Sequence, residues 1–186
     1  MTLLFVDVRG STTLAENISA TEFSVRMNRF YGAATDVLIK TDALIDKLIG
    51  DEVMAVYLPM FAGREPARLA VRAAQELLQA TGHGDPDGPW MPVGVGVHTG
   101  MAFFGTVSGA EGTVTDFTAL GDSVNIAARL ASNAGPGEAL ISEATCAAAG
   151  IDLDDCEQRA LELKGKSDLV NVQVMRANTA STSALA

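Results

Sequence analysis

This 186-residue chain has few cysteines, fewer basic than acidic residues, and no long hydrophobic run. Its two cysteines, Cys146 and Cys156, are too few for a disulfide framework or a structural zinc site. They favour inert thiols in a reducing, cytoplasmic compartment. No apolar stretch approaches the roughly 20 residues that span a bilayer, and no basic-then-apolar leader precedes the first apolar residues. We therefore expect no membrane contact in this fragment.

The charge balance excludes one class of partner. The chain carries 13 Lys and Arg against 23 Asp and Glu, a formal net charge of −10. Because a general nucleic-acid or anionic-membrane surface needs a basic face, we expect no nucleic-acid partner. A phosphate ligand remains open, since metal ions and a few local cations can reverse the sign of the charge inside one cleft.

The composition indicates one folded domain, because hydrophobic residues make up 48% and charged residues 19% of the chain. We assign this domain to residues 1–177 and expect the small, polar segment 178–186 to be a disordered tail. Apolar strand residues begin at Leu3, which favours an excised catalytic domain with a regulatory or membrane portion upstream. The alternative is a naturally short protein.

Hydrophobic spacing and turn residues predict the order of elements. We expect a strand over 2–8, a helix over 20–40, a hairpin of 43–49 and 52–58, a helix over 65–81, paired strands within 91–100 and 101–108, a turn and short extension over 108–118, a helix over 122–134, a strand over 138–142, a helix over 143–150 and a final hairpin around 163–175. The β-α-β-β-α-β order at the start predicts a ferredoxin-like α+β core with an antiparallel sheet and C-terminal additions.

Alternation along the first strand places Leu3, Phe5 and Asp7 on one face and Leu4 and Val6 on the other. Both faces are therefore apolar. Helices would cover one face, so we expect a partner subunit over the other.

Two acids at strand ends are candidate metal ligands. Asp7 ends the first strand, and Asp51 lies at the tip of the predicted hairpin. Together they would form a two-metal clamp, whereas alone each is also typical of a structural turn. The backbone amides of Gly10, Ser11 and Thr12, at a helix start, would cradle phosphate oxygens.

Lys47 and Thr118 form a candidate purine-reading pair. Lys has only donors, while a Thr hydroxyl can also accept. This pair suits adenine, which has a ring-nitrogen acceptor and an exocyclic amine; guanine, with a carbonyl and a ring N–H, would favour a Glu partner. The alternative for Lys47 is a side chain whose ammonium group reaches solvent.

Asn125 and Arg129 are four residues apart in the helix predicted over 122–134, so their side chains share one face. The amide would hold a ribose oxygen and the guanidinium a phosphate. The alternative is a surface pair in which Arg129 forms a salt bridge to Asp122 or Glu138.

Two further segments have structural alternatives. The basic tip Lys164-Gly165-Lys166 is either a phosphate-binding lid or a solvated hairpin. His98 is expected to pack or hydrogen-bond at a strand end, without a catalytic role.

Four motifs in order give the chain a resemblance to a known family. FVDVRGST, KLIGDEVMAVY, VGVGVHTG and ALGDSVNIAARL resemble the two metal motifs, the middle strand and the transition-state helix of the class III nucleotidyl cyclases, the adenylate and guanylate cyclase catalytic domains. The resemblance covers about residues 2–176.

The resemblance implies a head-to-tail homodimer with active sites at the interface, the fold of that family, and conversion of ATP to cyclic AMP and pyrophosphate. Asp7 and Asp51, assisted by the Val8 carbonyl, would bind two Mg²⁺ or Mn²⁺ ions. From the other subunit, Lys47 and Thr118 would read adenine, Asn125 would orient the ribose, and Arg129 would stabilise charge on the α-phosphate.

The chain departs from the family pattern at two positions. Thr118 stands where many members have Asp, and the Lys/Thr combination resembles a subgroup often found to respond to bicarbonate. Met101 stands where some members have a phosphate-binding Arg, which leaves the triphosphate to Lys164 or Lys166.

The competing interpretations are a guanylate cyclase, a catalytically silent dimerisation or nucleotide-sensing module, and a diguanylate cyclase or polymerase-like palm. The last should carry a Gly-Gly-acidic hairpin, whereas this hairpin has Ile49-Gly50-Asp51.

Overall fold

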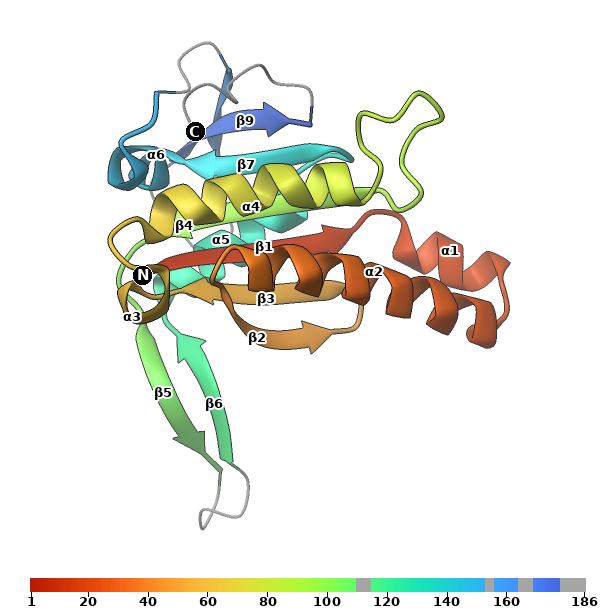
Figure 1. The fold of residues 1–186 in the computed structure, drawn as a ribbon, viewed down its shortest axis with the longest axis horizontal. Helices are drawn as coiled ribbons and strands as arrows, with labels where there is room; N and C mark the ends of the chain where they lie inside the picture. Colours follow the sequence, from red (N-terminus) through yellow and green to blue (C-terminus); the bar gives the residue numbers. More distant parts are fainter. Residues whose placement is uncertain (110–114, 153–155, 164–168, 178–186) are drawn as a thin grey trace.

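The computed structural model describes residues 1–109, 115–152, 156–163 and 169–177 (Figure 1). The elements are β1 (Thr2–Val8), α1 (Ser11–Asn17), α2 (Ala20–Lys40), β2 (Leu44–Ile49), β3 (Glu52–Tyr57), α3 (Pro59–Ala62), α4 (Pro66–Ala80), β4 (Val93–Thr99), β5 (Phe103–Ser108), β6 (Thr115–Leu120), α5 (Asp122–Asn133), β7 (Glu138–Ser142), α6 (Glu143–Ala149), β8 (Glu157–Leu161) and β9 (Val170–Arg176). The predicted tail, 178–186, lies outside the described residues.

A seven-stranded sheet has the order β2-β3-β1-β4-β7-β9-β8. Strand β1 lies between β3 and β4 and is antiparallel to both, which is the predicted ferredoxin-like core. The predicted β2–β3 hairpin is confirmed, and Gly50 takes the left-handed conformation (φ 61°) at its turn. The additions β7, β9 and β8 extend the sheet beyond β4, where β7 runs parallel to β4.

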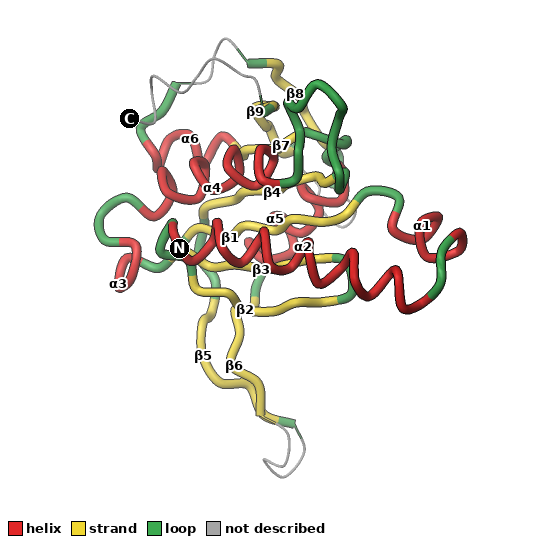
Figure 2. The backbone as a smooth tube through the Cα atoms, turned by 45° about the vertical axis from the view of Figure 1, so that its right-hand side comes forward, coloured by secondary structure: helices red, strands yellow, loops and turns green. Residues whose placement is uncertain are grey.

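The predicted pairing of 91–100 with 101–108 is wrong. Strand β4 is in the middle of the sheet, whereas β5 pairs with β6 in a separate two-stranded arm that projects from the body of the molecule (Figure 2). The expected short extension over 108–118 is in part the strand β6. Apolar alternation marks a strand but does not identify its partner, so the sequence pattern could not distinguish these pairings.

The expectation of an open sheet face is also wrong. Helices α2 and α4 cover one face, and α5 of the same chain covers the other (Figure 1). On the α5 side, Leu3 and Phe5 of β1 form a buried cluster that includes Ala127 and Ala131. The second face therefore needs no partner subunit for its burial.

Two glycines of β4 allow α5 to rest directly on the sheet. A Cβ atom at Gly96 would lie 2.2 Å from the backbone nitrogen of Ala131, and one at Gly94 would lie 2.9 Å from the Cβ of Ala134. The glycines of VGVGVHTG are thus sites of close backbone approach, which sets the position of α5.

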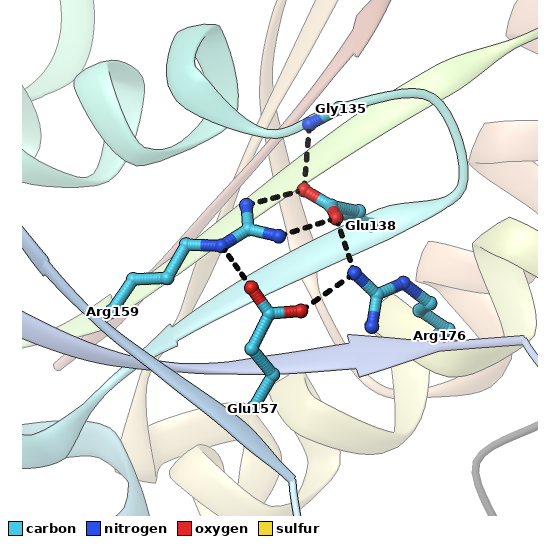
Figure 3. A network of polar contacts seen from close by, with 5 residues as sticks. All are labelled: Gly135, Glu138, Glu157, Arg159 and Arg176. Carbon is cyan, nitrogen blue, oxygen red and sulfur yellow. Dashed lines mark hydrogen bonds and ion pairs between the residues drawn. The ribbon is translucent and has the colours of Figure 1, made fainter.

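A polar network fixes the C-terminal strands to the rest of the sheet (Figure 3). Arg159 donates two hydrogen bonds of 2.7 Å to the Glu138 carboxylate, which also accepts from Arg176 at 2.7 Å and from the backbone N–H of Gly135 at 3.0 Å. Glu157 accepts from both arginines. These bonds lower the pKa of Glu138 to about 2, with the Arg159 hydrogen bonds as the main cause.

Across the described ranges, every helix is too short or too polar to serve as a membrane span.

Candidate active site

The β2–β3 hairpin brings Asp51 beside the end of β1. The backbone N–H of Val8 donates to the carbonyl oxygen of Asp51 at 3.0 Å. Asp7 lies opposite Glu52 in the β1–β3 register. Three carboxylates therefore meet at one corner of the sheet, and Glu52 joins the two that the sequence singled out.

This corner holds an excess of negative charge. Arg9 forms an ion pair with Asp7, and the Ser11 hydroxyl donates to Asp51. Burial raises the pKa of Asp7, opposed by Arg9 and assisted by the charge of Asp51. Burial, with the charges of Asp7 and Asp51, raises the pKa of Glu52 to about 7.

The donor set at this corner suits a hard divalent cation. Mg²⁺ is usually held by one or two protein carboxylates together with substrate phosphates and water. Asp7, Asp51 and the Val8 carbonyl are all oxygen donors at the same end of β1, and the negative charge favours a cation. In the described part of the chain, no group of three or more acidic, His or Cys side chains forms a ready-made metal cage.

The segment Gly10–Thr12 turns the chain from β1 into α1. Gly10 precedes the helix in the left-handed conformation (φ 72°), and no side chain caps the helix. Gly10 therefore occupies the N-cap position, while the Ser11 side chain contacts Asp51. The first backbone amides of α1 consequently begin immediately beside the acidic corner.

Lys47 and Thr118 both contact Asp46, a residue that the sequence motifs did not single out. The Thr118 hydroxyl donates to the Asp46 carboxylate at 2.7 Å, and the Lys47 ammonium lies 3.8 Å from the same oxygen. Lys47 also forms an ion pair with Asp116 on β6. The only local signal for Asp46 was a carboxylate beside Lys47 in a strand whose other residues are apolar.

A β-bulge explains how neighbouring side chains reach the same strand. The β2–β3 register shifts between Ile45 and Lys47, at Asp46. Successive side chains of a regular strand point to opposite faces. Here the extra residue re-aims the strand, so that Asp46 and Lys47 both contact β6.

Asn125 and Arg129 lie on a side of α5 that is not packed into the core. Asn125 is exposed and Arg129 is half-buried. Within the described residues, neither side chain forms a hydrogen bond or an ion pair. The alternative pairing of Arg129 with Glu138 is wrong, because Arg159 and Arg176 hold that carboxylate.

The structure thus places the predicted residues in three separate groups. Within the described residues, no hydrogen bond or ion pair links one group to another. The three groups are the acidic corner, the Lys47–Asp46–Thr118 group and the Asn125–Arg129 pair.

Lys164 and Lys166 lie outside the described residues. His98 hydrogen-bonds Ser142 at 2.9 Å, in keeping with its expected role at a strand end. Burial raises the pKa of the Cys146 thiol to about 11, which makes it unreactive.

Comparison with solved structures supports the fold. The adenylyl cyclase CyaB from P. aeruginosa superposes with a TM-score of 0.75 at 28% identity, covering 94% of this chain and 92% of that one. The guanylyl cyclase Cya2 superposes with a TM-score of 0.79 at 25% identity, covering 93% and 89%. The predicted fold class, that of class III cyclases, is therefore confirmed.

Sequence comparison gives the same result. The terminal-differentiation specific adenylate cyclase of Dictyostelium discoideum is 30% identical over 180 residues, which cover 92% of this chain and 8% of that protein. Two bacterial adenylate cyclases match over only 26% and 20% of their lengths. The chain thus corresponds to a small part of these longer relatives. The family model for the adenylate and guanylate cyclase catalytic domain matches residues 1–176. This chain therefore belongs to the adenylate and guanylate cyclase catalytic domain family.

Proposed function

We propose that this chain is an adenylate cyclase domain that converts ATP to cyclic AMP and pyrophosphate in a homodimer. The observation that carries the proposal is that one chain of this family holds two complementary groups. An acidic corner lies at the end of β1, and the Asn125–Arg129 pair, free of partners within the described residues, lies on α5. A silent module would be expected to lack part of this set.

The reaction joins the ribose 3′-oxygen to the α-phosphorus and breaks the bond from that phosphorus to the oxygen bridging to the β-phosphate. The 3′-hydroxyl loses its proton, and pyrophosphate leaves. Asn125 would hold the ribose so that the 3′-oxygen faces the phosphorus. Arg129 would stabilise the charge that develops on the α-phosphate through its fixed guanidinium donors.

Asp7, Asp51 and the Val8 carbonyl would hold two Mg²⁺ or Mn²⁺ ions. When bound, such ions neutralise phosphate charge and lower the pKa of a nearby hydroxyl. In this structure Arg9 pairs with the Asp7 carboxylate and Ser11 donates to the Asp51 carboxylate. These two side chains would turn away when a cation binds. The amides of Gly10, Ser11 and Thr12 would contact phosphate oxygens, as would Lys166.

The Lys47–Thr118 pair supports ATP over GTP. Lys47 would donate to the adenine ring nitrogen and Thr118 would accept from the exocyclic amine. Lys47 is partly exposed and bonded to the exposed Asp116, so a purine would replace Asp116 as its partner. Because Thr118 is 4% exposed, the base would reach its hydroxyl only after neighbouring side chains move.

The dimer is supported by exposed apolar side chains on and beside the β5–β6 arm. They are Met101, Phe103, Phe117 and Leu120, which are 48% to 93% exposed. A cluster of large apolar residues on a projecting hairpin is typical of a protein–protein contact. The acidic corner of one subunit would then meet the Asn125–Arg129 pair of the other.

Turnover of ATP and GTP, measured side by side with Mn²⁺, tests the proposal. We expect cyclic AMP as the main product, with a specific activity that rises with protein concentration as dimers form. A clear preference for GTP would show a guanylate cyclase instead. Full activity in an Asp51→Ala variant would contradict the metal-binding role.

A further inference from the structure

Asp46 is a buried carboxylate with almost no hydrogen-bonding partners. Its side chain is 1% exposed, and its Oδ1 atom has no hydrogen-bond partner among the residues that the structure describes. Its Oδ2 atom accepts from the Thr118 hydroxyl at 2.7 Å, while the Lys47 ammonium lies at 3.8 Å. Thr118 thus supplies the one hydrogen bond that the Asp46 carboxylate receives from described residues.

This contact orients the Thr118 hydroxyl, because the Asp46 Oδ2 atom lies at 2.7 Å whereas the alternative acceptor, the Ala119 carbonyl oxygen, lies at 3.5 Å. A Thr hydroxyl has one proton and can otherwise either donate to or accept from a ligand. Here the proton is directed at Asp46, so only the oxygen lone pairs remain for another partner. Turning the proton elsewhere would leave a buried carboxylate without its hydrogen bond, which is costly.

We infer that Asp46 is a positioning residue that makes Thr118 an obligate acceptor and so selects adenine over guanine. The inference rests on the proposed function, in which Lys47 and Thr118 face the purine edge. Adenine offers an amine donor, which an acceptor hydroxyl satisfies. Guanine offers a carbonyl there, which would face oxygen lone pairs, and a ring N–H, which would face the Lys47 donors.

The geometry of β2 supports this role. The bulge at Asp46 turns its carboxylate toward β6, the strand that carries Thr118. The neighbouring acid, Asp116, contacts Lys47 and does not hydrogen-bond Thr118. Asp116 therefore serves as the charged partner of Lys47, whereas Asp46 orients the Thr118 hydroxyl.

Binding of 3′-deoxy-ATP and 3′-deoxy-GTP, measured calorimetrically in the presence of Mn²⁺, tests the inference without turnover. Wild-type protein should prefer the adenine nucleotide. Asp46→Leu or Asp46→Ala should lower the ratio of the two affinities about tenfold or more, the effect of losing one well-placed hydrogen bond. Asp46→Asn retains an acceptor oxygen and should keep the preference. Asp116→Leu, the matched control beside Lys47, should keep it too.

A double-mutant comparison isolates the pathway through Thr118. In a Thr118→Val background the hydroxyl is gone, so Asp46→Leu should change the affinity ratio no further. Melting temperatures would show that each variant is folded.

The inference is overturned by an unchanged ratio in Asp46→Leu and Asp46→Ala, by an equal fall in Asp116→Leu, or by a wild type without base preference. A wild type that prefers the adenine nucleotide but forms no cyclic AMP would instead refute the proposed function and leave the role of Asp46 intact.

Discussion

Gly96 on β4 lies directly beneath the backbone of Ala131 on α5, with no room for a side chain between them. A Cβ atom at Gly96 would lie 2.2 Å from the Ala131 nitrogen and 2.5 Å from the Ala127 carbonyl oxygen. Because both contacts are with helix backbone, the helix would have to shift to accept a methyl group. Asn125 and Arg129 are carried by this helix, so the fold of β4 positions them.

We predict that Gly96→Ala destabilises the domain by about 1–3 kcal/mol through overpacking. It should also lower the rate of cyclic AMP formation about a hundredfold, because a displacement of about 1 Å at positioning groups costs that much. Urea unfolding and a steady-state assay would measure both effects. Gly32→Ala is the control, since a Cβ at this helical position meets nothing within 4 Å and should stabilise α2 by about 0.5–1 kcal/mol. Equal behaviour of the two variants would show that close approach of α5 is unimportant.

Local signals predicted much of this fold, because they act over a few residues. The helix over 20–40 was predicted from its apolar spacing, and the structure adds a capping box between Ser19 and Glu22 at its start. The turn at Gly50 likewise defined the hairpin that carries Asp51. Each of these features is encoded within one short segment.

Long-range features were not predictable in the same way. Alternation showed that both faces of β1 are apolar, but not that α5 covers the second face. No pattern within Phe103–Ser108 identified β6 as its partner, and nothing in the sequence marked the bulge at Asp46. The contact between Asp46 and Thr118 depends on both, since it joins residues 72 positions apart. Pairing over that distance is decided by packing of the whole sheet.

The Glu138 network predicts a loss of stability in acid. The hydrogen bonds of Arg159 and Arg176 hold the folded-state pKa of Glu138 at about 2, below its ordinary value of 4.5. A lowered folded-state pKa contributes stability that is fully present above about pH 4.5 and is lost as the pH falls toward about 2. Urea midpoints of the wild type should fall across this window.

Glu138→Gln should lower the free energy of unfolding at pH 7 by about 1–3 kcal/mol, since two arginines lose a charged acceptor. It should also flatten the dependence of stability on pH between 4.5 and 2. Asp36→Asn is the matched control, because Asp36 forms an exposed pair with Lys40 and should matter by less than about 1 kcal/mol. An unchanged acid profile in Glu138→Gln would contradict the assigned role.

The exposed arm predicts how dimerisation can be weakened. Phe103 is 55% exposed on β5, so Phe103→Lys should leave the folded subunit intact and place a charge in the proposed contact. We expect about a tenfold rise in the protein concentration that gives half-maximal specific activity, equivalent to about 1.4 kcal/mol. Sedimentation velocity would measure the dimer directly. Val25→Lys, at a 64% exposed position on α2, should have no such effect. An equal response of both variants would place the contact elsewhere.

Mixing two inactive variants tests whether the site is shared between subunits. Asp51→Asn removes a proposed metal ligand, and Arg129→Ala removes the proposed donor to the α-phosphate, so each should lower turnover about a hundredfold or more. In a head-to-tail dimer of one copy of each, one site carries both substitutions and the other carries neither. Equal mixing should restore about a quarter of wild-type activity, because about half of the dimers are mixed and each has one intact site. Two copies of Asp51→Asn, mixed in the same way, should remain inactive. If the mixture of Asp51→Asn and Arg129→Ala stays as inactive as either variant while sedimentation shows mixed dimers, Asp51 and Arg129 do not serve one site across the interface.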